Sequence, residues 1–203
     1  MNLDTYFSTP VWWDKLDIDA DAIFNFCHRM KQSDPRGNDV SNVGGWQSKE
    51  FYYGDHPELT PLLNEILLRS KKCLSDFGYG EENVETYMDN VWVNINKLNN
   101  YNKIHIHCSS FVSGAYYVTD SDAQIEFYRN FQEQYSIESL APISELNAIN
   151  APKISYPARK NHLVMFPSWL PHSVESNQED IERISISFNV RIRKKERQDK
   201  VEP

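Results

Sequence analysis

Two histidines stand two residues apart in a run of β-type residues, His105 and His107 in the stretch Ile-His-Ile-His. Successive side chains of a strand point to opposite faces, so residues at i and i+2 share one face. Two imidazoles on one face suit a transition-metal ion. The spacing alone fits a hydrogen-bonded surface pair equally well, and both interpretations stay open at this point.

A third histidine and a lone arginine follow in an order that would complete such a site. His172 comes directly after a hydrophobic run and a Pro-Ser-Trp-Leu-Pro turn, and Arg183 opens the next strand-like run. In that alternating run, Arg183 and Ser185 fall on one face. A buried guanidinium beside a hydroxyl can hold a carboxylate through bidentate, charge-assisted hydrogen bonds. For Arg183 alone, a surface ion pair at a strand end is the ordinary alternative.

Short β-type runs must carry these residues, because the chain after Glu85 consists of such runs separated by polar turns. The runs are TYMDNVWVNINKL, IHIHCSS, FVSGAYYVTD, AQIEFYR, HLVMFPS and RISISFNVRIR. Six or more runs in about 110 residues, with no helical pattern between them, are typical of a sandwich or jelly roll. The interval 130–158 has weak periodicity, and we expect a functional loop such as a lid, or partial disorder.

A helical layer precedes the strands. Residues 17–32 place several apolar residues near one helical face, namely Ile18, Ile23, Phe24, Cys27 and Met30. Residues 57–76 form a second expected helix that ends before Gly78, and residues 5–13 an edge strand or extended arm. We therefore predict one domain over 1–203, mainly β (α+β). It has a helical and extended part over about 1–83, a jelly-roll core over about 84–193 and a charged tail over 194–203.

Charge and cysteine usage limit the classes of partner. Twenty-one Lys and Arg against 29 Asp and Glu give a net charge of −8, which argues against general binding to nucleic acid or anionic lipid. Neither a signal-peptide pattern nor an apolar run of about 18 residues is visible. Three widely spaced cysteines are typical of reduced thiols. We expect a cytoplasmic protein without a membrane segment.

Taken together, these stretches resemble the 2-oxoglutarate- and Fe(II)-dependent dioxygenase superfamily, whose pattern is His-x-Asp/Glu, a distal His and then a basic residue, often as Arg-x-Ser. The closer resemblance is to a 2OG-Fe(II) oxygenase family with prolyl-hydroxylase-like members. Its texture appears here as Trp92-Val93-Asn94, Asn102 to His107, Ser113 to Val118, Phe166 to Val174, and Arg183 to Asn189. The similarity is strong over about 90–190 and looser in the early STPVW and SNVGGWQS stretches.

The resemblance implies a double-stranded β-helix, a jelly roll whose mouth holds iron, with three metal ligands: His105, His107 and His172. His107 stands where most of the superfamily has a carboxylate, so the site lacks the negative charge that would help to hold Fe(II). Either His107 binds the metal and the triad is all-histidine, or a carboxylate or water takes its place. The nearest carboxylates in the sequence are Glu126, Asp120 and Asp122.

The resemblance also implies a binding site for 2-oxoglutarate. Arg183 would hold the distal carboxylate, with hydrogen bonds from Ser185 and from Tyr117 rather than from its neighbour Tyr116. Asn94 and Asn102 could line the same cavity. Trp46 and Trp169 are candidates for its walls, with a core position as the alternative for each.

The implied activity is that of an Fe(II)- and 2-oxoglutarate-dependent dioxygenase that uses O₂ to hydroxylate a C–H bond and releases succinate and CO₂. One alternative is a cupin-like dioxygenase with three histidines and no co-substrate, and another is a jelly-roll binding module without catalysis. The substrate stays open, with a protein side chain or a small molecule favoured over duplex nucleic acid. The interval 130–158 is a candidate cover for the substrate, and the oligomeric state, including a homodimer, is undetermined.

Overall fold

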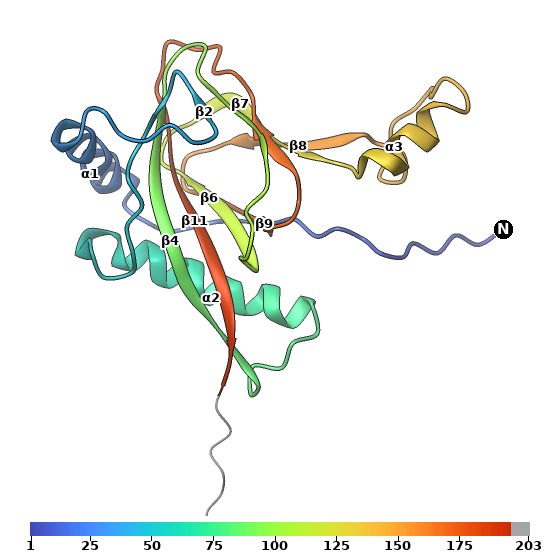
Figure 1. Ribbon diagram of the computed structural model, residues 1–203, viewed down its shortest axis with the longest axis horizontal. Coiled ribbons are helices and arrows are strands. Elements are labelled where there is room, and N and C mark those ends of the chain that lie inside the picture. Colours follow the sequence, from blue (N-terminus) through green and yellow to red (C-terminus); the bar gives the residue numbers. More distant parts are fainter. Residues whose placement is uncertain (196–203) are drawn as a thin grey trace, which may run out of the picture.

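Two antiparallel sheets lie against each other in the computed structural model, which describes residues 1–195 (Figure 1). Residues 196–203 of the predicted charged tail lie outside the described residues. The larger sheet has the strand order β1-β9-β6-β11-β4-β3, and the smaller one has the order β2-β5-β10-β7-β8. The predicted mainly β, two-sheet fold is confirmed.

The strands of the larger sheet are, in spatial order, β1 (Trp12–Lys15), β9 (His162–Pro167), β6 (Val112–Tyr117), β11 (Arg183–Lys194), β4 (Val84–Asn96) and β3 (Trp46–Gln47). Those of the smaller sheet are β2 (Asn42–Val43), β5 (Tyr101–His105), β10 (His172–Val174), β7 (Ser121–Tyr128) and β8 (Lys153–Ala158). The two longest strands, β4 and β11, pair along almost their whole length within the larger sheet (Figure 1).

Helices cover the outer face of the larger sheet (Figure 1): α1 (Ala20–Ser33), the short 3₁₀ helix η1 (Pro57–Leu59) and α2 (Thr60–Asp76). They correspond to the two predicted helices. The Asp19 side chain caps α1 by accepting hydrogen bonds from the backbone N–H groups of Asp21 and Ala22 at 3.1 and 3.0 Å. Among the helices of residues 1–195, none has the length and apolar character needed to cross a membrane.

The buried face of α1 differs from the predicted one at a single aromatic residue. Phe24 is 37% exposed, whereas Phe26 is buried together with Ile23 and Cys27. A helix turns about 100° per residue, so Phe26 and Cys27, three and four positions after Ile23, share its face. Phe24, which directly follows Ile23, does not.

Alternation along β11 divides the side chains between two environments. Ile184, Ile186 and Phe188 belong to the large core that the helices cover. Arg183 and Ser185, which point the other way, line a cavity between the sheets. A smaller apolar cluster shares this inner space, with members such as Phe127, Phe166 and Leu170. Buried polar residues on an inner sheet face are the informative exception in a protein core, and they mark this space as a site.

The interval 130–158 is more regular than we predicted at its two ends. These ends form α3 (Phe131–Glu138) and strand β8, which pairs with β7, whereas residues 139–152 between them contain neither helix nor strand. Helix α3 has no buried residue in the described chain and projects away from the sheets (Figure 1). The apolar residues of α3 do not form a stripe along one face, which explains the weak periodicity seen in the sequence. Strand β8 is an edge strand that contains Pro157, and both features weaken the strand pattern.

Candidate metal centre

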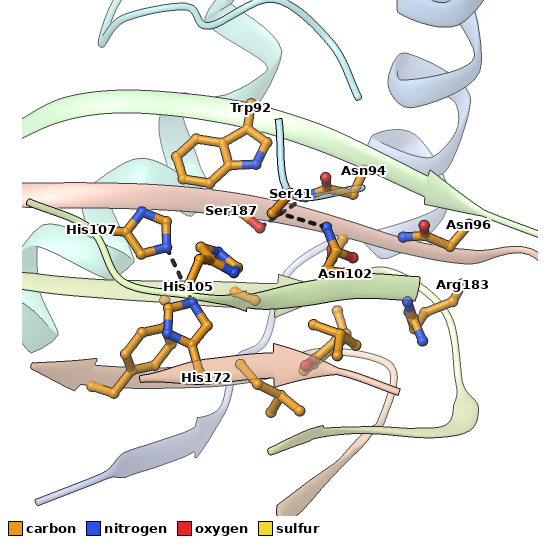
Figure 2. Close-up of a pocket in the computed structure, with 17 residues that line it drawn as sticks. Ser41, Trp92, Asn94, Asn96, Asn102, His105, His107, His172, Arg183 and Ser187 are labelled. Carbon is orange, nitrogen blue, oxygen red and sulfur yellow. Dashed lines mark hydrogen bonds between the residues drawn. The ribbon is translucent and has the colours of Figure 1, made fainter. Parts of the chain in front are cut away.

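Three imidazoles meet at one end of the space between the sheets (Figure 2). One ring nitrogen from each of His105, His107 and His172 lies within 4.8 Å of the other two, and the Nε2 atoms of His107 and His172 are 3.1 Å apart. Two histidine ligands at about 2.1 Å from one metal ion and at a right angle would be about 3.0 Å apart. The spacing therefore fits a shared ion.

Different backbone elements bring the three rings together. His105 ends β5 and lies opposite His172, the first residue of β10, in the pairing of these two strands. His107 lies beyond the end of β5, and its backbone N–H donates to the Ser168 carbonyl at 2.9 Å in the turn between β9 and β10. The prediction that His105 and His107 gather is confirmed, but a turn rather than a continuous strand positions the second ring.

Backbone carbonyls orient two of the rings. Nδ1 of His105 lies 2.7 Å from the Lys103 carbonyl, and Nδ1 of His172 lies 2.9 Å from the Leu170 carbonyl. A carbonyl only accepts, so each Nδ1 carries the proton and each Nε2 keeps its lone pair. A metal-binding histidine usually donates its other ring N–H to a carbonyl or carboxylate in this way.

Burial keeps the three imidazoles neutral. It lowers the pKa of His107 to about 4, helped by the neighbouring His105, and it lowers the pKa of His172 to about 3, again with a contribution from His105. The pKa of His105 is also lowered by burial. At neutral pH the lone pairs are available, and a metal ion would displace no proton to bind.

The far end of the same cavity holds a buried arginine (Figure 2). Arg183 is 1% exposed, which rules out the surface ion pair considered above. Its Nη1 donates to the Glu175 carbonyl at 2.9 Å, whereas its Nη2 is buried without a hydrogen-bond partner among residues 1–195. Burial raises the pKa of the nearby Tyr117 to about 12, so the phenol stays protonated there. An unpaired guanidinium N–H in a polar cavity is suited to receive an anionic oxygen.

Strand register sets the polar wall between the two ends. Ser185 lies opposite Asn94 on one side and Tyr117 on the other, and Arg183 lies opposite Asn96. From Arg183 to Ser187 the strand advances about 13 Å, at about 3.3 Å per residue. A small elongated dianion lying between the guanidinium and the imidazoles would therefore meet hydrogen-bonding side chains along this wall.

The structure gathers all eight predicted site residues around this one cavity: Asn94, Asn102, His105, His107, Tyr117, His172, Arg183 and Ser185. Tyr116 points the other way, as expected, and its hydroxyl donates to Asn161 Oδ1 at 2.7 Å. Glu126 is not part of the cluster, because it accepts a hydrogen bond from Tyr128 at 2.7 Å and forms an ion pair with Lys153. The carboxylate alternative for His107 therefore finds no support from Glu126.

Neither predicted tryptophan forms a wall of the cavity. Trp46 is buried in the core, where its Nε1 donates to the Asp34 carbonyl, and Trp169 is 55% exposed. The wall is formed instead by Trp92, whose ring lies over His107 with centroids 5.6 Å apart and planes 28° apart (Figure 2). Sequence reasoning also missed Ser41, Asn96 and Ser187. Alternation along β4, which puts Trp92, Asn94 and Asn96 on one face, could have indicated two of the four.

Residues 90–189 match the family model "Putative 2OG-Fe(II) oxygenase", and the match includes every histidine of the triad as well as Arg183. The matched segment, 100 of the 203 residues, belongs to this family. The family consists of 2-oxoglutarate- and Fe(II)-dependent oxygenases, so the enzyme class and the cofactors predicted from the sequence are confirmed. No curated protein matches the sequence of this oxygenase.

Solved structures show the same fold at low sequence identity. A Pseudomonas putida prolyl-4-hydroxylase superposes with a TM-score of 0.60 at 13% identity, covering 91% of this oxygenase and 93% of that chain. The non-heme alpha ketoglutarate dependent carbocyclase SnoK of nogalamycin biosynthesis gives 0.63 at 13% identity, with 91% and 80% covered. A Trichoplax adhaerens prolyl hydroxylase in complex with a peptide fragment gives 0.57 at 13% identity, with 89% and 82% covered. These matches support the jelly-roll fold alone.

Proposed function

We propose that this oxygenase is an Fe(II)- and 2-oxoglutarate-dependent hydroxylase whose iron is held by three histidines, His105, His107 and His172. The co-substrate would lie along the polar wall, with its distal carboxylate on Arg183 and hydrogen bonds to Ser185 and Tyr117. Asn94 and Asn102 line the same cavity and would border the bound co-substrate.

The observation that carries the proposal is the unpaired Nη2 of buried Arg183, which shares one cavity with three neutral imidazoles. A buried charged donor without a partner costs free energy that a bound anion would recover. A metal site alone would not require that arginine, so the pair of features favours a dicarboxylate co-substrate over a metal-only dioxygenase.

The residues of the chain would bind the metal ion and the co-substrate, orient both of them, and exclude water. His105 and His172 would hold the ion through their Nε2 lone pairs and His107 through one ring nitrogen, and Arg183 would fix the far end of the co-substrate. Apolar side chains that line the cavity, Ile125 and Phe166, keep water from the reacting atoms. Bound Fe(II) with 2-oxoglutarate and O₂ supplies oxidative decarboxylation, in which one oxygen atom enters succinate and the other hydroxylates a C–H bond.

A protein side chain or a small molecule is the proposed substrate class. The prolyl hydroxylase from Trichoplax adhaerens binds a peptide fragment, which makes a protein substrate compatible with this fold. The net charge of −8 disfavours duplex nucleic acid. The cysteine usage supports the cytoplasm as the proposed compartment.

The test measures succinate release from 2-oxoglutarate by the wild type with Fe(II), and 2-oxoglutarate binding in the presence of Mn(II). The proposal expects substrate-independent succinate release and a dissociation constant for 2-oxoglutarate that rises at least about 100-fold in Arg183→Ala, as for loss of a charge-assisted pair. Arg191→Ala, which removes an arginine paired with Asp89 outside the cavity, is the matched control. Metal binding that is indifferent to 2-oxoglutarate would instead identify a metal-only dioxygenase.

A further inference from the structure

The three imidazoles are not held in the same way. His105 and His172 each have an Nδ1 fixed by a backbone carbonyl. No carbonyl or side chain among residues 1–195 forms such a hydrogen bond with Nδ1 of His107. The Ser168 carbonyl holds the backbone of His107 but leaves its two side-chain torsions unrestrained.

An aromatic wall takes the place of the missing hydrogen bond. The Trp92 ring lies 5.6 Å from the His107 ring at an angle of 28°, within the range of offset-stacked aromatic pairs. In that orientation the His107 ring is parallel to the His172 ring within 8°, and its Nε2 faces the Nε2 of His172 at 3.1 Å. Figure 2 shows Trp92 above His107, on the side away from His172.

We propose that Trp92 is a positioning residue that sets the ring plane of His107 for metal binding. The inference rests on the proposed function, because it assumes that His107 is a metal ligand. Trp92 is not among the proposed metal ligands. The pairing of Trp92 with Ser187 fixes the backbone of Trp92 on β4, and the indole offers a flat surface against which the freer imidazole can rest.

The experiment is a double-mutant cycle with Mn(II) or Co(II) affinity as the readout, measured calorimetrically on the full chain. Trp92→Ala should weaken metal binding about tenfold, the lower range for loss of a group that orients a ligand. Trp92→Phe should restore most of the affinity, because a phenyl ring also stacks. In a His107→Asp background, which should retain or strengthen metal binding, Trp92→Ala should have no effect, since a carboxylate needs no ring plane.

Two further measurements sharpen the cycle. The visible absorption of bound Co(II) should change in Trp92→Ala and return in Trp92→Phe, as a changed ligand geometry requires. Trp13→Ala, which removes a 64% exposed tryptophan from β1, is the matched control and should leave both readouts unchanged. Near-ultraviolet circular dichroism of the metal-free variants confirms that each one is folded.

The outcomes separate this inference from the proposed function. Equal weakening by Trp92→Ala in the two backgrounds, or no weakening in either, would overturn the positioning role while the Arg183 result still stands. Loss of all metal binding in His107→Asp would overturn the assignment of His107 and the inference with it. A wild type that binds no metal would overturn the proposed function first.

Discussion

At the scale of single residues, the proposed metal site has a neutral ring, His107, where the superfamily pattern has a carboxylate. A carboxylate ligand would offset part of the charge of Fe(II), whereas three imidazoles of lowered pKa offset none of it. The remaining positive charge attracts a dianion more strongly in a partly desolvated cavity than it would in water. Together with Arg183, this favours tight coupling between the binding of the metal and the binding of 2-oxoglutarate.

The buried histidines also predict how the metal-free protein responds to acid. In the unfolded chain a histidine takes up a proton near pH 6.5, but in the folded chain burial lowers the pKa of His107 to about 4 and of His172 to about 3. Between these values the unfolded chain binds more protons, so the free energy of unfolding should fall as the pH drops from about 6.5 towards 4. Stability is fully retained above that window.

Urea unfolding of metal-free protein at several pH values checks this. Each histidine should contribute a slope of up to about 1.4 kcal/mol per pH unit inside the window. His172→Gln, which keeps a polar side chain but cannot take up the proton, should flatten the slope, and His56→Gln, on the far side of the larger sheet, serves as the control. A wild-type slope identical to that of His172→Gln would contradict the prediction.

At the scale of elements, the residue types of the site were predictable from the sequence and their local geometry was not. Alternation in β11 correctly put Arg183 and Ser185 on one face. Asn102 and His105, however, stand three residues apart and still both line the cavity, because the pairing of β5 with β10 shifts register between them. Such a bulge depends on pairing between strands distant in sequence, so no local pattern reports it.

The same reason explains the larger misses. Alternation along β4 can indicate the face on which Trp92 lies, but its contact with His107 exists only once β4 and the turn between β9 and β10 meet. Helix α3 buries no residue in the described chain, so it leaves no amphipathic signal in the sequence. Periodicity along the chain correctly indicated the strand-rich fold, and the order of the motifs correctly indicated that the histidines and Arg183 gather around one cavity.

The exposure of α3 predicts that the segment can be removed without unfolding the protein. Joining residues 130 and 151 by a short Gly-Ser linker keeps the end of the β7–β8 hairpin, where the Arg129 N–H donates to the Pro152 carbonyl at 2.9 Å. The free energy of unfolding should change by less than about 1 kcal/mol, since little apolar area is lost. Succinate release without substrate should persist, because the residues that line the cavity include none from α3.

Thermal and urea unfolding together with a succinate assay measure the result. Ile125→Ala, which truncates a buried residue of the adjacent strand, is the control and should cost about 2–5 kcal/mol. A deletion variant as unstable as that control, or one that no longer binds Mn(II), would show that α3 supports the core.

At the scale of the whole molecule, the proposed ligands bridge the two sheets. His105 and His172 belong to strands of the smaller sheet, whereas Arg183 belongs to β11 of the larger one. A dicarboxylate bound to the metal at one end and to Arg183 at the other would tie the sheets together across their inner face. The apolar cluster that joins them there is much smaller than the core under the helices, so this tie should contribute visibly to stability.

The bridge predicts that metal and 2-oxoglutarate stabilise the fold cooperatively. A ligand at 100 times its dissociation constant adds about 2.7 kcal/mol, which raises the melting temperature of a chain of this size by about 5–10 °C. Mn(II) alone should give part of this rise and 2-oxoglutarate alone little, because without the metal only one of its ends is held. Both ligands together should raise the melting temperature by more than the sum of the separate shifts, and EDTA should remove the whole effect.

In Arg183→Ala the shift from Mn(II) should remain while the extra shift from 2-oxoglutarate disappears, because only the tie to the larger sheet is cut. Differential scanning calorimetry of the wild type and this variant decides the matter: additive shifts in the wild type would mean that the two ligands do not share one cavity.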